Sequence, residues 1–160
     1  DKNKILLINL ISKSSGHEGI AGGQFSDLSF EKKKVSIKKV LDMQNKKTAK
    51  LFSFCCMAPL LISDKKKELN KFNKIGQDIG LLFQIVDDLI DFKGNSKLAG
   101  KKTKKDKTQG KATLISLLGY KNTIKYAEEL KLNIYKNIKK YGNKTNDLKN
   151  TIEFILNRNN

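Results

Sequence analysis

The chain has 160 residues, of which 38% are hydrophobic and only one is proline, and this composition excludes disorder and allows one buried core. A net charge of +17 first suggests a nucleic-acid partner, but Arg158 is the only arginine among 33 basic residues. Base recognition and bidentate phosphate contacts favour arginine, so we expect no nucleic-acid partner.

The first part of the chain alternates short apolar segments with glycine and serine. Residues 4–14 have the pattern of a helix that Ser14, Ser15 and Gly16 would end. The sequence begins at Asp1 and leads directly into this apolar segment, which suggests a truncation point. The glycine-rich residues 19–28 predict a turn, and residues 34–43 predict a short helix.

Residues 47–62 predict a mostly apolar, buried helix. Its longest apolar run, residues 51–62, has 12 residues, whereas a membrane-spanning helix needs about 20. Cys55 and Cys56 are adjacent, and neighbouring cysteines rarely meet disulfide geometry. We therefore expect a cytoplasmic protein without stable membrane insertion.

The second part of the chain predicts one long helix and three shorter ones. Asp64 is expected to cap a helix over residues 65–92, and Gly94 to end it. A basic loop over 93–110 follows. The remaining helices are predicted over residues 111–118, 121–140 and 146–158, which makes the fold class all-α in a single domain, residues 1–160.

Four polar residues of the long helix share one edge. Gln84, Asp87, Asp88 and Asp91 stand at i, i+3, i+4 and i+7, a spacing that places them on one side of a helix. Carboxylates so placed repel one another within an apolar helix and need a cation. Oxygen ligands favour a hard ion, Mg²⁺ before Ca²⁺. The plain alternative is a solvated acidic face paired with lysines.

A basic segment follows this acidic edge. Residues 93–111 contain eight lysines and one acid, Asp106, and Lys101 and Lys111 each follow a glycine. Glycine lets the backbone approach a ligand closely. A diphosphate would suit this pattern, because a metal would join it to the aspartates and lysines would neutralise its other oxygens. Lys47 and Thr48 could add a charge and a hydroxyl donor.

Five motifs in order resemble those of the trans-isoprenyl diphosphate synthase family, in particular its bacterial farnesyl/geranylgeranyl diphosphate synthases, over nearly the whole chain. Phe83–Asp91 is similar to the family's second aspartate-rich motif, FQxxDDxxD. The other matching segments are Gly22–Leu28 (GGQxxDL), Lys46–Thr48 (HKT, with Lys46 where His is common), Gly100–Lys101 with Asp106, and Gly110–Gly119 (GKATxxSLLG).

The resemblance implies the C-terminal part of the isoprenoid synthase helical bundle and a prenyltransferase. Such an enzyme condenses an allylic diphosphate with isopentenyl diphosphate and releases pyrophosphate, with Mg²⁺ as cofactor and Mn²⁺ as the alternative. It also implies residue roles. Asp87 would bind metal directly, and Asp88 and Asp91 through water. Lys47, Lys101 and Lys111 would contact the diphosphate. Thr48 and Gln84 would lie beside the allylic cation, and Phe83 would face the isopentenyl group. Gln24 and Asp27 would support the cavity wall.

The pattern also departs from the family. The first aspartate-rich motif and the isopentenyl diphosphate site are absent from this sequence, so we expect no catalysis from residues 1–160 alone and exposed apolar surface. Three alternatives remain open: a non-catalytic subunit of a heteromeric synthase, a basic nucleic-acid or membrane-surface protein, and a terpene cyclase, whose second metal motif is absent. The resemblance further implies a homodimer, and the GKATLISLLG segment favours a C15 or C20 product.

Overall fold

The computed structural model describes residues 2–98 and 112–157, and of 95–98 the backbone only. Within these residues every regular element is a helix, which confirms the all-α class. The main helices are α1 (Lys2–Ser15), α2 (Ile20–Ser29), α3 (Ile37–Gln44), α4 (Lys50–Ile62), α5 (Leu69–Leu98), α6 (Leu114–Leu118), α7 (Tyr120–Ile138) and α8 (Asn146–Asn157). Three shorter segments join them: the π-helix η1 (Asn45–Ala49) and the 3₁₀ helices η2 (Lys66–Glu68) and η3 (Lys139–Thr145).

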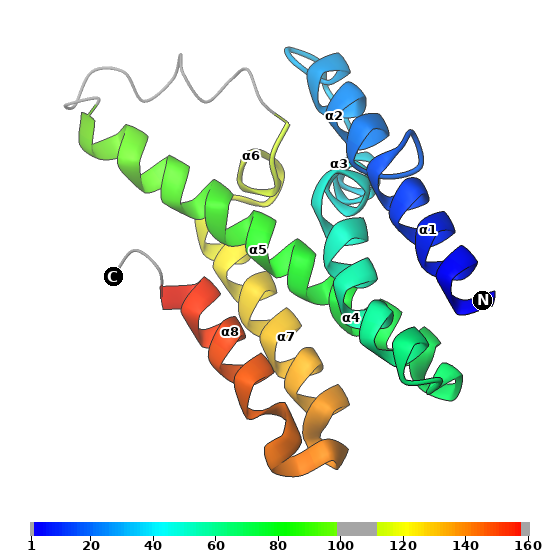
Figure 1. Ribbon diagram of the computed structural model, residues 1–160. Coiled ribbons are helices and arrows are strands. Elements are labelled where there is room, and N and C mark those ends of the chain that lie inside the picture. Colours follow the sequence, from blue (N-terminus) through cyan, green and yellow to red (C-terminus); the bar gives the residue numbers. More distant parts are fainter. Residues whose placement is uncertain (1, 99–111, 158–160) are drawn as a thin grey trace.

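Helix α5 forms the centre of the bundle. It runs between α1 to α4 on one side and α7 and α8 on the other (Figure 1). One stripe of α5 is fully buried, with Ile75, Leu82 and Ile85 all 0% exposed. These side chains share a core with residues of α3, α6, α7 and α8, namely Val40, Met43, Leu114, Ala127, Leu130, Ile134, Ile138, Ile152 and Ile155. A long helix buried in this way is a rigid support for the polar edge that it also carries.

Local capping explains several helix boundaries. The Ser36 hydroxyl accepts a hydrogen bond from the backbone N–H of Lys39 at the start of α3. At the start of α6, Thr113 and Ser116 bond to each other's backbone N–H in a capping box. Gly119 follows α6 with a φ of +80°, a conformation that glycine adopts without strain, and the chain turns there into α7.

Three predictions about helix ends were wrong. Residues 20–28 lie in helix α2 (Ile20–Ser29) instead of a turn, and Gly23 sits where the backbone of Lys47 approaches closely. Asp64 does not cap α5: it has a φ of +55° in the turn after α4, and η2 lies between it and α5. Gly94 does not end α5, which continues to Leu98, since one glycine costs a helix only about 1 kcal/mol.

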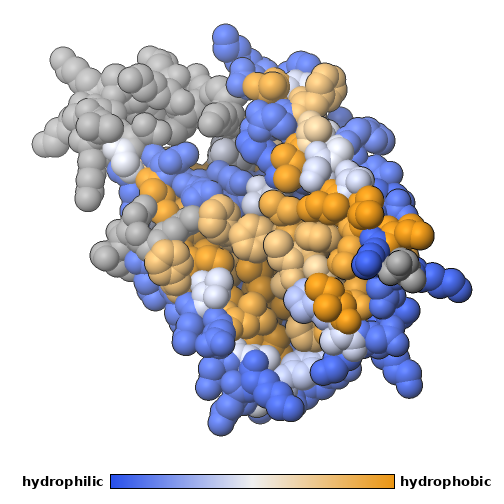
Figure 2. Space-filling view, in the orientation of Figure 1, coloured by the Kyte–Doolittle hydropathy of each residue, from blue (hydrophilic) through white to orange (hydrophobic). Residues whose placement is uncertain are grey.

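Large apolar side chains lie exposed on several helices. Figure 2 shows apolar side chains in a band across one face, over the region of α4 and α5. Large hydrophobic residues are also exposed on α1, α2 and α4, namely Ile5, Leu6, Ile8, Phe25, Leu28, Leu51 and Ile62. Apolar patches of this kind mark contact surfaces. No helix within the described ranges has the length and apolar character needed to cross a bilayer.

Candidate active site

The site begins where α3 passes into α4 through the π-helix η1. This wider turn holds Lys47 and Thr48, and its wider winding re-aims the side chains that follow relative to a regular helix. Helix α2 packs directly on it: a Cβ built on Gly23 would lie 2.2 Å from the Lys47 backbone nitrogen. Only glycine fits there, so Gly23 of the GGQ segment serves a close helix crossing.

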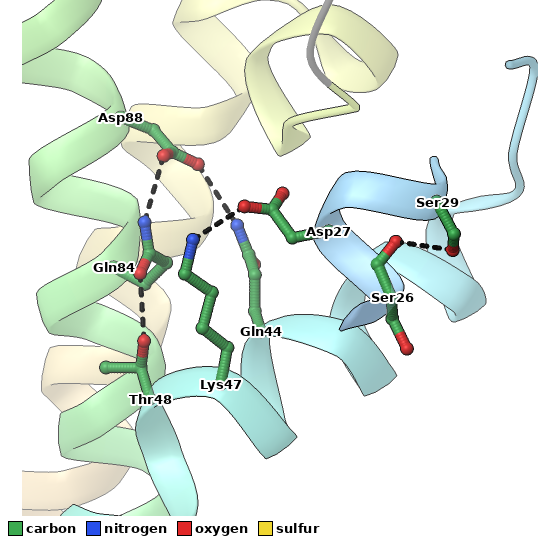
Figure 3. Close-up of polar contacts among 8 residues, drawn as sticks. All are labelled: Ser26, Asp27, Ser29, Gln44, Lys47, Thr48, Gln84 and Asp88. Carbon is green, nitrogen blue, oxygen red and sulfur yellow. Dashed lines mark hydrogen bonds and ion pairs between the residues drawn. The ribbon is translucent and has the colours of Figure 1, made fainter. Parts of the chain in front are cut away.

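Lys47 and Asp27 form the most charged contact of this crossing. The Lys47 ammonium lies 2.6 Å from Asp27 Oδ2, and the two side chains are 31% and 20% exposed. The pair joins η1 to α2 (Figure 3). Lys47, predicted to contact the substrate, and Asp27, predicted to support the cavity wall, therefore form one ion pair. In this pair Asp27 fixes the position of the ammonium.

A hydrogen-bond network connects η1 to the acidic edge of α5. The Thr48 hydroxyl donates to Gln84 Oε1 at 2.9 Å, and Gln84 Nε2 donates to Asp88 Oδ1 at 3.1 Å. The second Asp88 oxygen accepts from Gln44 Nε2 at 3.0 Å. In Figure 3 these side chains converge between α5, α3 and η1. The structure therefore brings together Lys47, Thr48, Gln84 and Asp88, which the sequence singled out separately.

Asp88 is a perturbed carboxyl group on this edge. Its pKa is raised to about 6, chiefly by burial and further by the neighbouring charges of Asp87, Asp91 and Asp27, while the hydrogen bond from Gln84 opposes the rise. Because desolvation and like charges both disfavour the carboxylate, a cation nearby would be strongly favoured. A perturbed acid in a polar cluster is typical of a functional site.

The other two aspartates of the motif differ in exposure. Asp87 is half-buried and Asp91 is exposed. Phe83, on the same helix, is half-buried and lies against Phe52 of α4, with ring centroids 5.3 Å apart. Lys101 and Lys111, predicted to contact the diphosphate, lie outside the described residues. Gln44 was not predicted, although it stands at i−3 from Lys47, a spacing that could have drawn attention to it.

The acidic edge fits Mg²⁺ in the chemistry of its donors. Asp87, Asp88 and Asp91 offer only hard oxygen ligands. In the part of the chain that the structure describes, no three His, Cys, Asp or Glu side chains converge on one metal position. Mg²⁺ is commonly held by one or two carboxylates, with water and substrate phosphate as the other ligands. The donors therefore suit a Mg²⁺ ion that binds together with a diphosphate.

Comparison with known proteins agrees with this chemistry. The polyprenyl synthetase family matches residues 2–155. A geranylgeranyl diphosphate synthase of Cyanophora paradoxa is 35% identical over 158 residues, which are 98% of this chain and 53% of that protein. The chain thus spans about half the length of the curated relatives it matches.

Solved structures show the same fold. An FPP/GFPP synthase of Zymomonas mobilis superposes with a TM-score of 0.82 at 30% identity, covering 96% of this chain and 51% of that one. A geranyltransferase of Helicobacter pylori, in complex with magnesium and isoprenyl diphosphate, gives a TM-score of 0.77 at 26% identity, covering 99% and 52%. The matched family, the relatives and the shared fold agree, and the chain belongs to the polyprenyl synthetase family.

Proposed function

We propose that residues 1–160 supply one side of the active site of a magnesium-dependent prenyltransferase, which joins an allylic diphosphate to isopentenyl diphosphate. The observation that carries this proposal is the contact network in which η1 and the acidic edge of α5 meet. Lys47 and Thr48 stand on one side of it, and Asp88 and its neighbouring aspartates stand on the other. A cationic group beside an acidic edge is the arrangement that a metal-bound diphosphate requires.

The reaction needs no protein nucleophile. The C–O bond of the allylic diphosphate breaks, pyrophosphate leaves with the electron pair, and the double bond of isopentenyl diphosphate attacks the allylic cation. Loss of a proton then completes the longer trans product. Magnesium, held by Asp87 directly and by Asp88 and Asp91 through water, would neutralise charge on the departing pyrophosphate.

The described residues would contribute position and charge. The Lys47 ammonium already has an anionic partner in Asp27, and a diphosphate oxygen would compete for the same donors. Thr48 and Gln84 place hydroxyl and amide oxygen atoms close together at the network, where their dipoles can stabilise an allylic cation. Phe83 would face the isopentenyl group, and Lys101 and Lys111 would add charge to the diphosphate. We favour a C15 or C20 product.

The exposed apolar residues of α1 and α2 support a homodimer. Ile5 is 60% exposed, Ile8 63% and Phe25 74%. Large apolar side chains at this exposure stabilise a protein when they are covered by a partner. A second copy of the chain would cover them, and we place the assembly in the cytoplasm.

Binding of a substrate analogue tests the proposal. Isothermal titration calorimetry would measure the Kd of geranyl S-thiolodiphosphate, whose C–S bond resists ionisation, with and without Mg²⁺. We expect binding only with Mg²⁺, and a loss of at least about 10-fold in the Asp87→Asn variant. Mass spectrometry after incubation with geranyl and isopentenyl diphosphates should find no product from residues 1–160 alone. Equal affinity in EDTA and in Mg²⁺ would contradict the proposed function.

A further inference from the structure

Gln44 is a buried polar residue at the end of α3. Its side chain is 2% exposed, and its Nε2 donates to Asp88 Oδ2 at 3.0 Å. Its other polar atom, Oε1, is buried with no hydrogen-bond partner among the residues that the structure describes. Burying an amide oxygen without a partner costs free energy. A buried amide oxygen without a partner therefore needs an explanation other than stability.

The hydrogen bond from Gln44 helps to orient the Asp88 carboxylate. Gln84 holds the first oxygen of that carboxylate from within α5, and Gln44 holds the second from α3. Two donors from different helices fix the plane of the carboxylate, which one donor on the same helix would leave free to rotate. The acidic edge thereby keeps a fixed direction relative to α3.

The same helix also positions the cationic side. Helix α3 continues without a break into η1, so Gln44 lies three residues before Lys47 and four before Thr48. Thr48 closes the loop by donating to Gln84. The contacts therefore run from α3 to Asp88, along α5 to Gln84, and back to η1 (Figure 3). Through these bonds, the direction of Asp88 and the places of Lys47 and Thr48 depend on one another.

We propose that Gln44 is a positioning residue that holds Asp88 in register with Lys47 and Thr48 for magnesium-dependent diphosphate binding. This inference rests on the function proposed above. Gln44 acts through Asp88 and needs no contact with the substrate. Its loss should weaken the use of Mg²⁺ more than it weakens the fold.

The test compares Gln44→Met with Gln77→Met. Methionine keeps the length of the side chain and removes the amide. Gln77 is a matched control, because it lies on α5 and donates only within its own helix, to Asn73 at 3.5 Å. Calorimetry would measure methylenebisphosphonate binding over a series of Mg²⁺ concentrations, and circular dichroism would follow thermal unfolding. Gln44→Met should raise the Mg²⁺ concentration for half-maximal binding about 10-fold, with recovery at saturating Mg²⁺. Gln77→Met should leave it unchanged.

A second measurement on the unmodified protein does not depend on how the variant folds. The ¹⁵N resonance of the Gln44 side-chain amide should shift when Mg²⁺ and methylenebisphosphonate are added together, and the Gln77 amide should not. Unchanged magnesium dependence in a folded Gln44→Met variant, or a Gln44 amide that does not respond in a protein that binds the probe, would overturn this inference alone. Failure of the unmodified protein to bind the probe with Mg²⁺ would overturn the proposed function and this inference with it.

Discussion

Two aspartates on α5, the buried Asp78 and the half-buried Asp88, have opposite surroundings. Asp78 is 2% exposed and accepts from the Lys74 ammonium at 2.7 Å and from Asn133 of α7 at 3.1 Å. Asp88, ten residues on, accepts only from the amides of Gln44 and Gln84 among the described residues. The Lys74 ammonium neutralises the Asp78 carboxylate, so this contact is structural. Asp88 has no ammonium partner within the described ranges, and that difference is what a cation-binding edge requires.

The largest effect on stability should come from Asp78. Asp78→Ala removes a charge-assisted hydrogen bond from Lys74 within α5 and an amide hydrogen bond from Asn133 of α7. Each hydrogen bond to a charged group is worth about 1.5–3 kcal/mol, so we expect a loss of roughly 3 kcal/mol in the free energy of unfolding. Urea unfolding measures it. Magnesium-dependent binding of methylenebisphosphonate should stay intact in this variant, and its loss would remove the distinction between the two aspartates.

Asp88→Asn should have a smaller effect on stability, and one that depends on pH. The folded pKa of Asp88, about 6, lies above its ordinary value of 3.8. Between these values the folded state binds more protons than the unfolded state, so this group stabilises the protein fully below about pH 4. That contribution is lost as the pH rises through about 6, at up to about 1.4 kcal/mol per pH unit.

The measurement for Asp88 is a series of urea unfolding curves from pH 4 to 7 in EDTA. The difference between the unmodified protein and Asp88→Asn isolates this group from the other carboxylates, whose dependence is common to both. At pH 7 the variant should be within about 1 kcal/mol of the unmodified protein or more stable, because it no longer buries a charge. A pH-independent difference would show that folding does not shift the pKa of Asp88.

The sequence predicted the polar edge of α5 because helical spacing is a local property. Gln84, Asp87, Asp88 and Asp91 recur at three- and four-residue intervals, and the apolar residues between them fix which side is buried. The same reasoning could not find the hydrogen bond between Gln44 and Asp88, whose residues are 44 positions apart. Such a contact depends on how α3 crosses α5, which no local pattern encodes.

Glycine was the least informative residue in the sequence. Gly22 and Gly23 predicted a turn, yet they lie in α2, where the space beside Gly23 is filled by the backbone of Lys47. Gly94 predicted a helix end, yet a Cβ there would meet nothing within 4 Å, and α5 continues. Gly23 allows a close helix crossing, whereas Gly94 makes no such contact. The role of a glycine therefore depends on its tertiary contacts. The π-helical turn of η1 has no local signal either.

A third carboxylate, Glu68, lies just before α5 and extends the comparison. Of the changes considered, the one at its partner Tyr141 should have the smallest effect on stability. Hydrogen bonds from Tyr141 and then Lys140 hold the Glu68 pKa below the ordinary value. Tyr141→Phe keeps the ring that lies 5.5 Å from Phe72 and removes only the hydroxyl that bonds to Glu68. The Glu68 pKa should rise in this variant but stay below its ordinary value, because the Lys140 ammonium remains 3.1 Å away.

¹³C NMR titration of the Glu68 carboxyl carbon measures this shift. A lowered pKa stabilises the fold above the unfolded value, and this contribution is lost as the pH falls through the folded value, so Tyr141→Phe should lose less stability on acidification. Lys140→Gln serves as the control, because it removes the ammonium and leaves the hydroxyl, and it should shift the pKa less. If Lys140→Gln has the larger effect, then charge rather than hydrogen bonding sets the ionisation of Glu68. By the same reasoning, the difference in ionisation between Asp78 and Asp88 would come from the Lys74 ammonium alone, and their amide partners would contribute little.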